Sequence, residues 1–133
     1  ADASFQNTVV SNYLLKVAGT AQAPVAGFNT QGRGYPDISA AGLSYLVAVG
    51  GGFYSESGTS ASSPFVAGLF SNINAQRLAI GKGSLGWINP TLYQTYTQFT
   101  NDITSGDNKC VLGPICCAQG FTSVAGWDPT TGI

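Results

Sequence analysis

The chain contains no histidine among its 133 residues, and only 8% of its residues are charged. Ordinary soluble domains carry about 25% charged residues. Without histidine, a serine or cysteine nucleophile lacks its usual imidazole base, and a zinc site with Cys/His spacing is disfavoured. So little charge favours a chain largely wrapped in other protein, or a secreted protein with a polar, uncharged surface.

Nucleic acid and membranes are disfavoured as partners by the distribution of charged and apolar residues. Five Lys or Arg residues nearly balance six Asp or Glu residues, and they form no basic patch. No segment approaches the roughly 20 apolar residues of a membrane-spanning helix. The length is that of one domain. No signal peptide is visible at Ala1, which predicts a mature or an internal chain.

The three cysteines, Cys110, Cys116 and Cys117, cluster in a Gly- and Pro-containing segment near the C-terminus. This clustering favours a disulfide and hence an oxidising compartment. The odd count leaves one cysteine, which is either free or bridged to another polypeptide. A catalytic thiol is disfavoured because it would lack a histidine partner.

Apolar periodicity predicts helices and strands in the first three quarters of the chain. Residues Ser4 to Val17 have helical spacing. Tyr45 to Val49 is an apolar run that fits a buried strand, such as one in a parallel sheet, and three glycines then break it. The segment Ala61–Ile80 is apolar nearly all round, which predicts a buried helix. We also expect a Gly-rich loop over 18–36, a short strand at Ile38–Ala41, a helix over Pro90–Gln98 capped by Asn89, and a structured loop from Phe99 onward.

A strand, a turn and a buried helix form the repeating unit of an α/β protein. The strands that would cover the buried helix are mostly missing from the sequence. We therefore expect the α/β fold class and infer that the chain is part of a larger fold.

The segment Ser57–Pro64, SGTSASSP, places Ser60 after a Gly-Thr pair and before the apolar helix. A serine at a helix N-terminus lies beside unpaired N–H groups that can stabilise an oxyanion. Gly58 permits a tight turn and a close approach of substrate. Pro64 near the first turn costs little, because its missing N–H would be unpaired there. These features suit a nucleophile, and the alternative is that Ser60 is only an N-cap.

The string GTSASSPFVAG, from Gly58 to Gly68, resembles the nucleophile segment shared by subtilisins and sedolisins, two families of serine peptidases. Four further segments, in the right order, resemble sedolisins, and the fungal tripeptidyl-peptidase-like members most. These segments are RGYPDISAAG (33–42), LGWINPTLYQ (85–94), NDITSGDN (101–108) and GWDPTTG (126–132).

By this resemblance, residues 1–133 form the C-terminal segment of a peptidase catalytic domain. The implied fold is a subtilisin-like parallel sheet with helices on both faces, with the nucleophile helix at about 60–80 and a calcium loop at about 99–133. Sedolisins take the Glu and Asp of their triad, and an Asp of the oxyanion hole, from regions upstream of the matched segments. The resemblance therefore implies a missing N-terminal part, supplied by the N-terminal chain of the same precursor.

The implied function is that of an acid-active serine-carboxyl endo- or tripeptidyl-peptidase acting on peptides or proteins. Ser60 would attack the scissile carbonyl, and the glutamate would take its proton. The Ser60 backbone N–H and the upstream aspartate would hold the oxyanion. A carboxylate base, with a reference pKa near 4.3, works at acidic pH where imidazole is protonated, which accounts for the missing histidine.

Such a peptidase would be secreted or would lie in an acidic vacuolar or lysosomal compartment. The missing carboxylates and the odd cysteine also allow a different reading. In that alternative the chain is a non-catalytic, processed remnant that acts as a binding or storage protein.

Asp102 and Asp128 lie in Gly-rich sequence near the C-terminus. By resemblance they bind calcium through their carboxylates, together with the carbonyls of Ile103, Val124 and Gly126 and with water. Val124 replaces the first glycine of the family's Gly-x-Gly-x-Asp pattern, which a carbonyl ligand tolerates. From spacing alone, the alternative is that both aspartates only make Asx-turns.

Two other carboxylates are left outside the predicted site. Asp37 is expected to be buried or capping, supporting the sheet and pairing with Arg33 in a surface ion pair of little energetic value. Glu56, four residues before Ser60, is expected to be an exposed loop charge.

Overall fold

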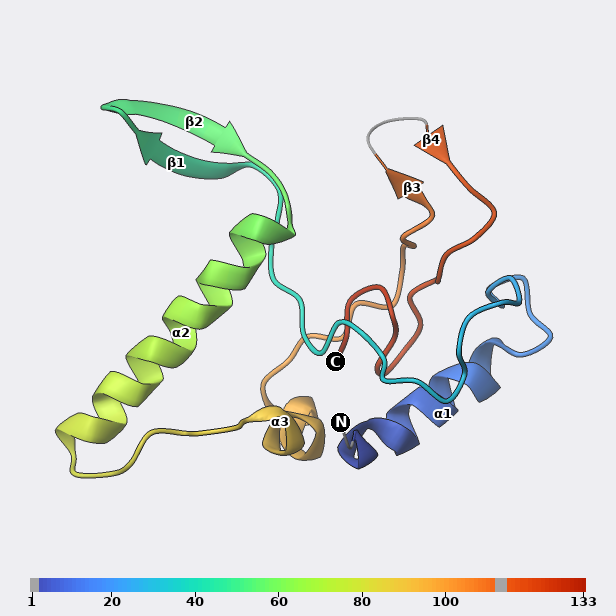
Figure 1. Ribbon diagram of the computed structural model, residues 1–133, viewed down its shortest axis with the longest axis horizontal. Helices are drawn as coiled ribbons and strands as arrows, with labels where there is room; N and C mark the ends of the chain where they lie inside the picture. Colours follow the sequence, from blue (N-terminus) through green and yellow to red (C-terminus); the bar gives the residue numbers. More distant parts are fainter. Residues whose placement is uncertain (1–2, 112–114) are drawn as a thin grey trace. The chain divides into compact units, whose positions relative to one another are not determined.

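The computed structural model describes residues 3–111 and 115–133. The chain divides into two compact units, one formed by Ala1–Ile38 with Ile88–Ile133 and the other by Ser39–Trp87. Figure 1 shows the helices and strands along the chain. Among the described residues, the elements are three α-helices, short 3-10 turns and two antiparallel pairs of strands. The chain is thus a small α/β piece, and its described strand pairs are antiparallel.

The unit 39–87 begins with a β-hairpin formed by β1 (Tyr45–Val49) and β2 (Gly52–Glu56). β1 has the predicted bounds, but it pairs antiparallel with β2, from Tyr45 opposite Glu56 to Val49 opposite Gly52. Gly50 and Gly51 both have positive φ, 59° and 83°, as a two-residue hairpin turn requires. The glycines therefore end β1 after Val49, as predicted, but they also turn the chain into a second strand that the sequence analysis did not predict.

The helix α2 spans Thr59–Ala79, against the predicted 61–80. Because it starts earlier, Pro64 is its sixth residue and leaves the Ser60 carbonyl without an i+4 donor. No residue of α2 is buried; the side chains of Phe65 and Leu69 are 56% and 52% exposed. The expected burial of α2 and β1 is therefore not found within the described residues.

The other unit contains η1 (Ser4–Gln6), α1 (Asn7–Val17), α3 (Asn89–Thr95), η2 (Tyr96–Gln98), β3 (Cys110–Val111) and β4 (Ile115–Cys116). The predicted helix 4–17 corresponds to η1 and α1, and the predicted helix 90–98 corresponds to α3 and η2. The expected strand Ile38–Ala41 is irregular. Asn89 is not the cap of α3, because Ile88 takes that position.

The core of this unit is formed by aromatic and aliphatic side chains from α1, α3 and the C-terminal segment. Tyr13 and Val17 lie one turn apart on α1 and are buried. Tyr13 packs edge-on against Trp127, with ring centroids 6.0 Å apart. No helix of the described chain is long and apolar enough to cross a bilayer.

Asp37 is the centre of a half-buried polar network in the same unit. Its carboxylate accepts hydrogen bonds from Arg33 Nη2 (2.6 Å), Tyr93 Oη (2.9 Å) and Asn89 Nδ2 (3.0 Å). The Gln6 amide, itself fully buried, donates to Tyr93 Oη and lies 3.5 Å from the Asp37 carboxylate. The Arg33–Asp37 pair was predicted, but it is part of a network of half-buried groups rather than an isolated surface pair.

This network shifts the titration of two of its members. Burial raises the pKa of the Tyr93 phenol; the Gln6 amide opposes this shift and the Asp37 carboxylate adds to it. Burial alone would lower the pKa of Arg33, but the Asp37 carboxylate raises it above its ordinary value on balance. Both phenol and guanidinium therefore stay in their protonated forms across the physiological range.

Gly34 lies where the core leaves no room for a side chain. Its backbone N–H donates to Gln6 Oε1 and its carbonyl accepts from Gln6 Nε2, both at 2.9 Å. A Cβ built on Gly34 would lie 2.3 Å from the Trp127 ring. The absence of a side chain thus lets the Gln6 amide and the Trp127 ring pack on the same backbone.

We expect Gly34→Ala to lower the free energy of unfolding by about 1–3 kcal/mol, the range for overpacking a filled core. Chemical denaturation of the protein that carries this chain measures the change. Gly83→Ala is the matched control, because a Cβ there meets nothing within 4 Å. Equal stabilities of the two variants would contradict the packing described here.

Candidate functional site

Ser60 is the second residue of α2 and is exposed to solvent. Gly58 caps the helix with a φ of 147°, a conformation that side chains rarely adopt. Its N–H donates to the carbonyl of Gly42 at 2.6 Å, and its own carbonyl accepts from the N–H of Ala61 at 2.9 Å. Gly58 therefore fixes the turn that presents Ser60.

The segment 41–44 holds this turn from the other side. Ser62 Oγ donates to the carbonyl of Ala41 at 3.1 Å, and the Ser44 N–H donates to Ser57 Oγ at 3.0 Å. A Cβ on Gly42 would lie 2.7 Å from Ser62 Oγ, so only glycine permits this approach. Sequence reasoning missed these contacts, because they join residues that are distant along the chain.

The Ser60 hydroxyl has no hydrogen-bond partner among the described residues, and it is not an N-cap, since Gly58 holds that position. In the unit 39–87, all of which the structure describes, Glu56 is the only carboxylate. Glu56 is exposed, as predicted, but it ends strand β2 rather than lying in a loop. A general base for Ser60 is thus not provided by the described residues of this unit.

The predicted metal ligands Asp102, Val124, Gly126 and Asp128 are joined by hydrogen bonds in the other unit. Asp102 Oδ2 accepts from the N–H of Gly126 at 2.7 Å, and Asp128 Oδ2 accepts from the N–H of Val124 at 3.1 Å. Each aspartate therefore binds the short segment that carries the predicted carbonyl ligands. Ile103, the fifth predicted ligand, follows Asp102 directly and is exposed.

Antiparallel contacts close the loop on which these residues lie. The Ser123 N–H donates to the carbonyl of Gly106 at 2.9 Å, and the Asn108 N–H donates to the carbonyl of Phe121 at 3.1 Å. The Ser123 hydroxyl is buried and has no hydrogen-bond partner among the described residues. The described chain contains no group of three or more His, Cys, Asp or Glu side chains that could hold a metal ion.

The carbonyl oxygens of Ile103, Val124 and Gly126 accept no hydrogen bond from any described residue, whereas the carbonyl of Ala125 accepts one from Lys16 Nζ. Three backbone acceptors thus have unused lone pairs near the two carboxylates. Lys16 was not singled out from the sequence, although a basic residue in the last turn of a helix was visible there.

Asp128 also makes the turn that the sequence offered as the alternative to metal binding. Its Oδ1 accepts hydrogen bonds from the N–H groups of Thr130 and Thr131, at 2.9 and 2.8 Å, and the side chain is fully buried. The bond to Thr130 closes an Asx-turn. Asp128 therefore organises the loop with or without a bound ion.

Tyr13 joins α1 to this loop. Its hydroxyl donates to the carbonyl of Thr122 at 3.4 Å. Burial raises the pKa of the Tyr13 phenol, the bond to Thr122 opposes this, and the negative charge of Asp128 adds to the rise. The phenol therefore remains protonated and can keep donating to the loop.

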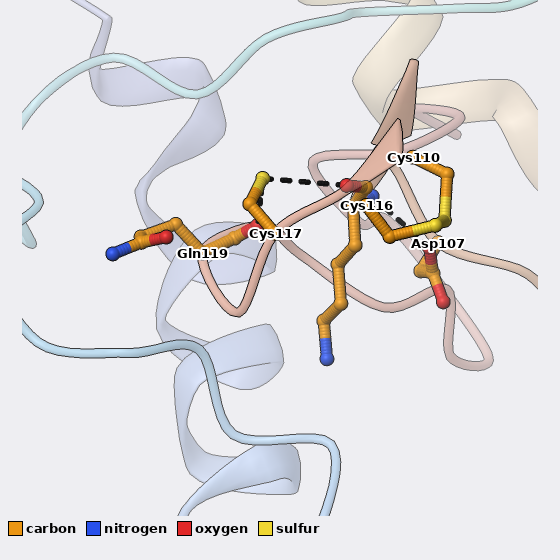
Figure 2. The surroundings of a disulfide bond; sticks show 6 residues. Asp107, Cys110, Cys116, Cys117 and Gln119 are labelled. Carbon is orange, nitrogen blue, oxygen red and sulfur yellow. Dashed lines mark hydrogen bonds between the residues drawn. A yellow bond between two sulfur atoms is a disulfide. The ribbon is translucent and has the colours of Figure 1, made fainter. Parts of the chain in front are cut away.

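The cysteine pairing that the sequence left open is Cys110–Cys116, which joins β3 to β4. Figure 2 shows the disulfide and, pointing away from it, the exposed thiol of Cys117. That thiol lies 3.3 Å from the carbonyls of Lys109 and Gln119. The third cysteine is therefore free in this structure.

Comparison with known proteins finds relatives that match most of the chain. It is 41% identical to physarolisin of Physarum polycephalum over 134 aligned residues, 98% of the chain and 23% of that protein. It is 47% identical to aorsin of Aspergillus oryzae over 106 residues, 80% of the chain and 15% of that protein. It is 40% identical to tripeptidyl-peptidase 1 of Dictyostelium discoideum over 109 residues, 80% of the chain and 18% of that protein.

The chain thus spans less than a quarter of the length of each of these curated relatives. No protein-family model matches it.

We expect Asp128→Asn to lower the free energy of unfolding by about 1–3 kcal/mol even with a chelator present. The asparagine amide can keep its oxygen at the Oδ1 position as an acceptor. Its NH₂ group then faces the N–H of Val124, so two donors meet and the hydrogen bond to Val124 is lost. Asp107→Asn is the control, because among the described residues the Asp107 carboxylate accepts a hydrogen bond only from the N–H of Lys109, which an amide oxygen also accepts. Urea denaturation of both variants measures the difference, and indistinguishable midpoints would contradict the organising role of Asp128.

Proposed function

This chain belongs to the sedolisin family of serine-carboxyl peptidases, and from that premise we propose that it is the part of such a peptidase that carries the nucleophile, Ser60. The observation that carries this proposal is the geometry of the turn before α2. Gly58 and the 41–44 segment hold Ser60 exposed at the start of a helix, with its hydroxyl unengaged. Ser60 is the second residue of α2, and Gly58 holds the N-cap position, so Ser60 does not serve as the helix cap.

In the proposed reaction, Ser60 Oγ attacks the scissile carbonyl of a peptide or protein. A glutamate from an N-terminal part of the same precursor takes the hydroxyl proton, and an aspartate orients that glutamate. The Ser60 backbone N–H, together with a protonated aspartate from upstream, holds the tetrahedral oxygen. Hydrogen-bond donors that stabilise this oxygen in a water-excluded site usually make the largest single contribution to the rate enhancement.

The carboxylate base sets the proposed pH range. A glutamate with an ordinary pKa near 4.3 is competent as a base in mildly acidic solution, and the oxyanion aspartate donates only when it is protonated. We therefore propose activity at acidic pH, as an endo- or a tripeptidyl-peptidase. The names of several relatives, among them tripeptidyl-peptidases, support a peptide substrate.

The exposed apolar surface of the unit 39–87 supports completion by more polypeptide. Leu46 on β1 and Phe53 on β2 are 72% and 73% exposed, and α2 has no buried residue. Large exposed apolar patches are one mark of a surface that contacts other protein. We propose that the N-terminal part of the precursor covers it, which would place the hairpin and α2 within a subtilisin-like fold with a parallel sheet and helices on both faces.

We further propose a calcium ion in the C-terminal loop, bound by the carboxylates of Asp102 and Asp128 and the carbonyls of Ile103, Val124 and Gly126. Hard cations prefer such oxygen donors. Three observations support this site. The two carboxylates bind one short segment. Among the described residues, the three carbonyls accept no hydrogen bond and the buried Ser123 hydroxyl has no hydrogen-bond partner. Bound calcium would attract oxygen atoms from both segments, 102–103 and 124–128, and so hold them together.

The location we propose is extracellular, or an acidic vacuolar or lysosomal compartment. The Cys110–Cys116 disulfide supports an oxidising environment.

The second candidate is a non-catalytic remnant that serves as a binding or storage protein, and the single carboxylate of the unit 39–87 favours it. The intact mass of the native, unreduced protein separates the two functions. A partner polypeptide that carries a Glu–Asp helix supports the peptidase, and a stably folded species of 13.6 kDa alone supports the remnant.

In the complete protein at acidic pH, we expect a fluorophosphonate probe to label Ser60. Ser60→Ala should abolish labelling and lower kcat on the order of a millionfold, the loss seen when a serine peptidase loses its nucleophile. Ser63→Ala is the control, because Ser63 is an exposed serine of the same helix. Unchanged activity in Ser60→Ala would refute the proposed role.

Removal of calcium should lower the melting temperature, because an ion that binds only the native state stabilises it by about 2.7 kcal/mol at a hundred times its Kd. Differential scanning calorimetry with and without a chelator measures the effect. Asp102→Asn should reduce the difference between the two conditions. A transition that is the same in both conditions would count against the calcium site and would leave the role of Ser60 untouched.

A further inference from the structure

Lys16 brings a positive charge to the loop in which we propose the calcium site. It lies in the last turn of α1, and its Nζ donates a hydrogen bond to the carbonyl of Ala125. Ala125 lies between Val124 and Gly126, the two residues whose carbonyls are proposed calcium ligands. Gly126 is close as well, since a Cβ built on it would lie 3.7 Å from Lys16 Nζ.

An ammonium group and a hard metal cation seek the same partners, namely carbonyl and carboxylate oxygens. The lysine ammonium is a compact point charge with three donors on a flexible stem. Asp102 accepts from the N–H of Gly126, so a carboxylate and the backbone carbonyls lie close to where Lys16 binds. The loop thus already binds one cationic group, the ammonium of Lys16.

We propose that Lys16 is an internal competitor of calcium, a residue that holds the metal-free loop against α1 and lowers the loop's affinity for divalent cations. The inference rests on the proposed calcium site. The physical basis is electrostatic, because the positive charge of Lys16 repels a divalent ion nearby. The hydrogen bond from Lys16 to Ala125 also stabilises the metal-free loop. Lys16 therefore tunes the affinity of the loop for divalent cations and is not a ligand.

The effect of the charge can be bounded. A unit charge several ångströms from a divalent ion at the water-exposed surface changes the binding constant by about two- to tenfold, after screening by physiological salt. Because the effect is electrostatic, it should shrink as salt is added. A contribution from shape alone would not depend on ionic strength.

The experiment is isothermal titration of calcium into the full protein, first stripped with a chelator, at low and at high ionic strength. Lys16→Met removes the charge and keeps most of the apolar stem. Lys16→Arg keeps the charge and a donor. Lys82→Met removes the same charge from the unit 39–87, and the Lys82 ammonium makes no hydrogen bond or ion pair with a described residue. Circular dichroism of each metal-free variant checks folding.

We expect Lys16→Met to bind calcium about two- to tenfold more tightly than the unchanged protein, and the gain to fall at high salt. Lys16→Arg and Lys82→Met should stay near the unchanged affinity. Lys16→Met should also show a larger rise in melting temperature on addition of calcium, because its metal-free loop has lost a stabilising contact.

An affinity of Lys16→Met that is equal to or weaker than that of the unchanged protein overturns the inference while the calcium site stands. Binding by Lys16→Met alone supports the inference in its strongest form. If neither the unchanged protein nor any variant binds calcium, the calcium site itself is wrong and the competition falls with it. The three results are distinguishable within one set of titrations.

Discussion

The carboxylate of Asp37 is the interaction on which the unit formed by the two ends of the chain depends. It binds groups from the loop before it and from α3, while the buried amide of Gln6 joins η1 to the same network. The backbone of Asp37 also accepts the N–H of Ile133, and a side chain at Gly132 would collide with that carbonyl. Segments from both ends of the sequence thus meet at one residue, and the loop in which we propose the calcium site lies on the segment that returns to it.

The two units bury their apolar residues very differently, and the difference bears on function. The Asp37 unit buries Tyr13, Val17 and Trp127 within itself. The hairpin and α2 have no buried residue and leave several large apolar side chains exposed, so the element that carries Ser60 has no core of its own among the described residues. In the proposed function, further polypeptide would have to cover this apolar surface and bring a base to Ser60. Folding and catalysis would then be completed by the same contacts.

The C-terminal loop, in which we propose the calcium site, is organised by hydrogen bonds within the chain. Asp128 makes the Asx-turn that the sequence offered as an alternative, and the same carboxylate binds the segment of the predicted carbonyl ligands. The contacts of Tyr13 and Lys16 hold the loop against α1. Calcium would therefore add stability and charge to a loop whose path is already determined by hydrogen bonds.

Sequence reasoning located most helices and the strand Tyr45–Val49, because apolar periodicity is a local property of the chain. The motif around Ser60 and the order of the five segments were enough to identify the family, which the relatives confirm. Only the tertiary structure decided the antiparallel partner of β1, the pairing Cys110–Cys116 and the partners of Asp37 and Asp128. Those features depend on contacts between distant residues, and no local pattern records which distant group a carboxylate, a thiol or a strand edge will meet.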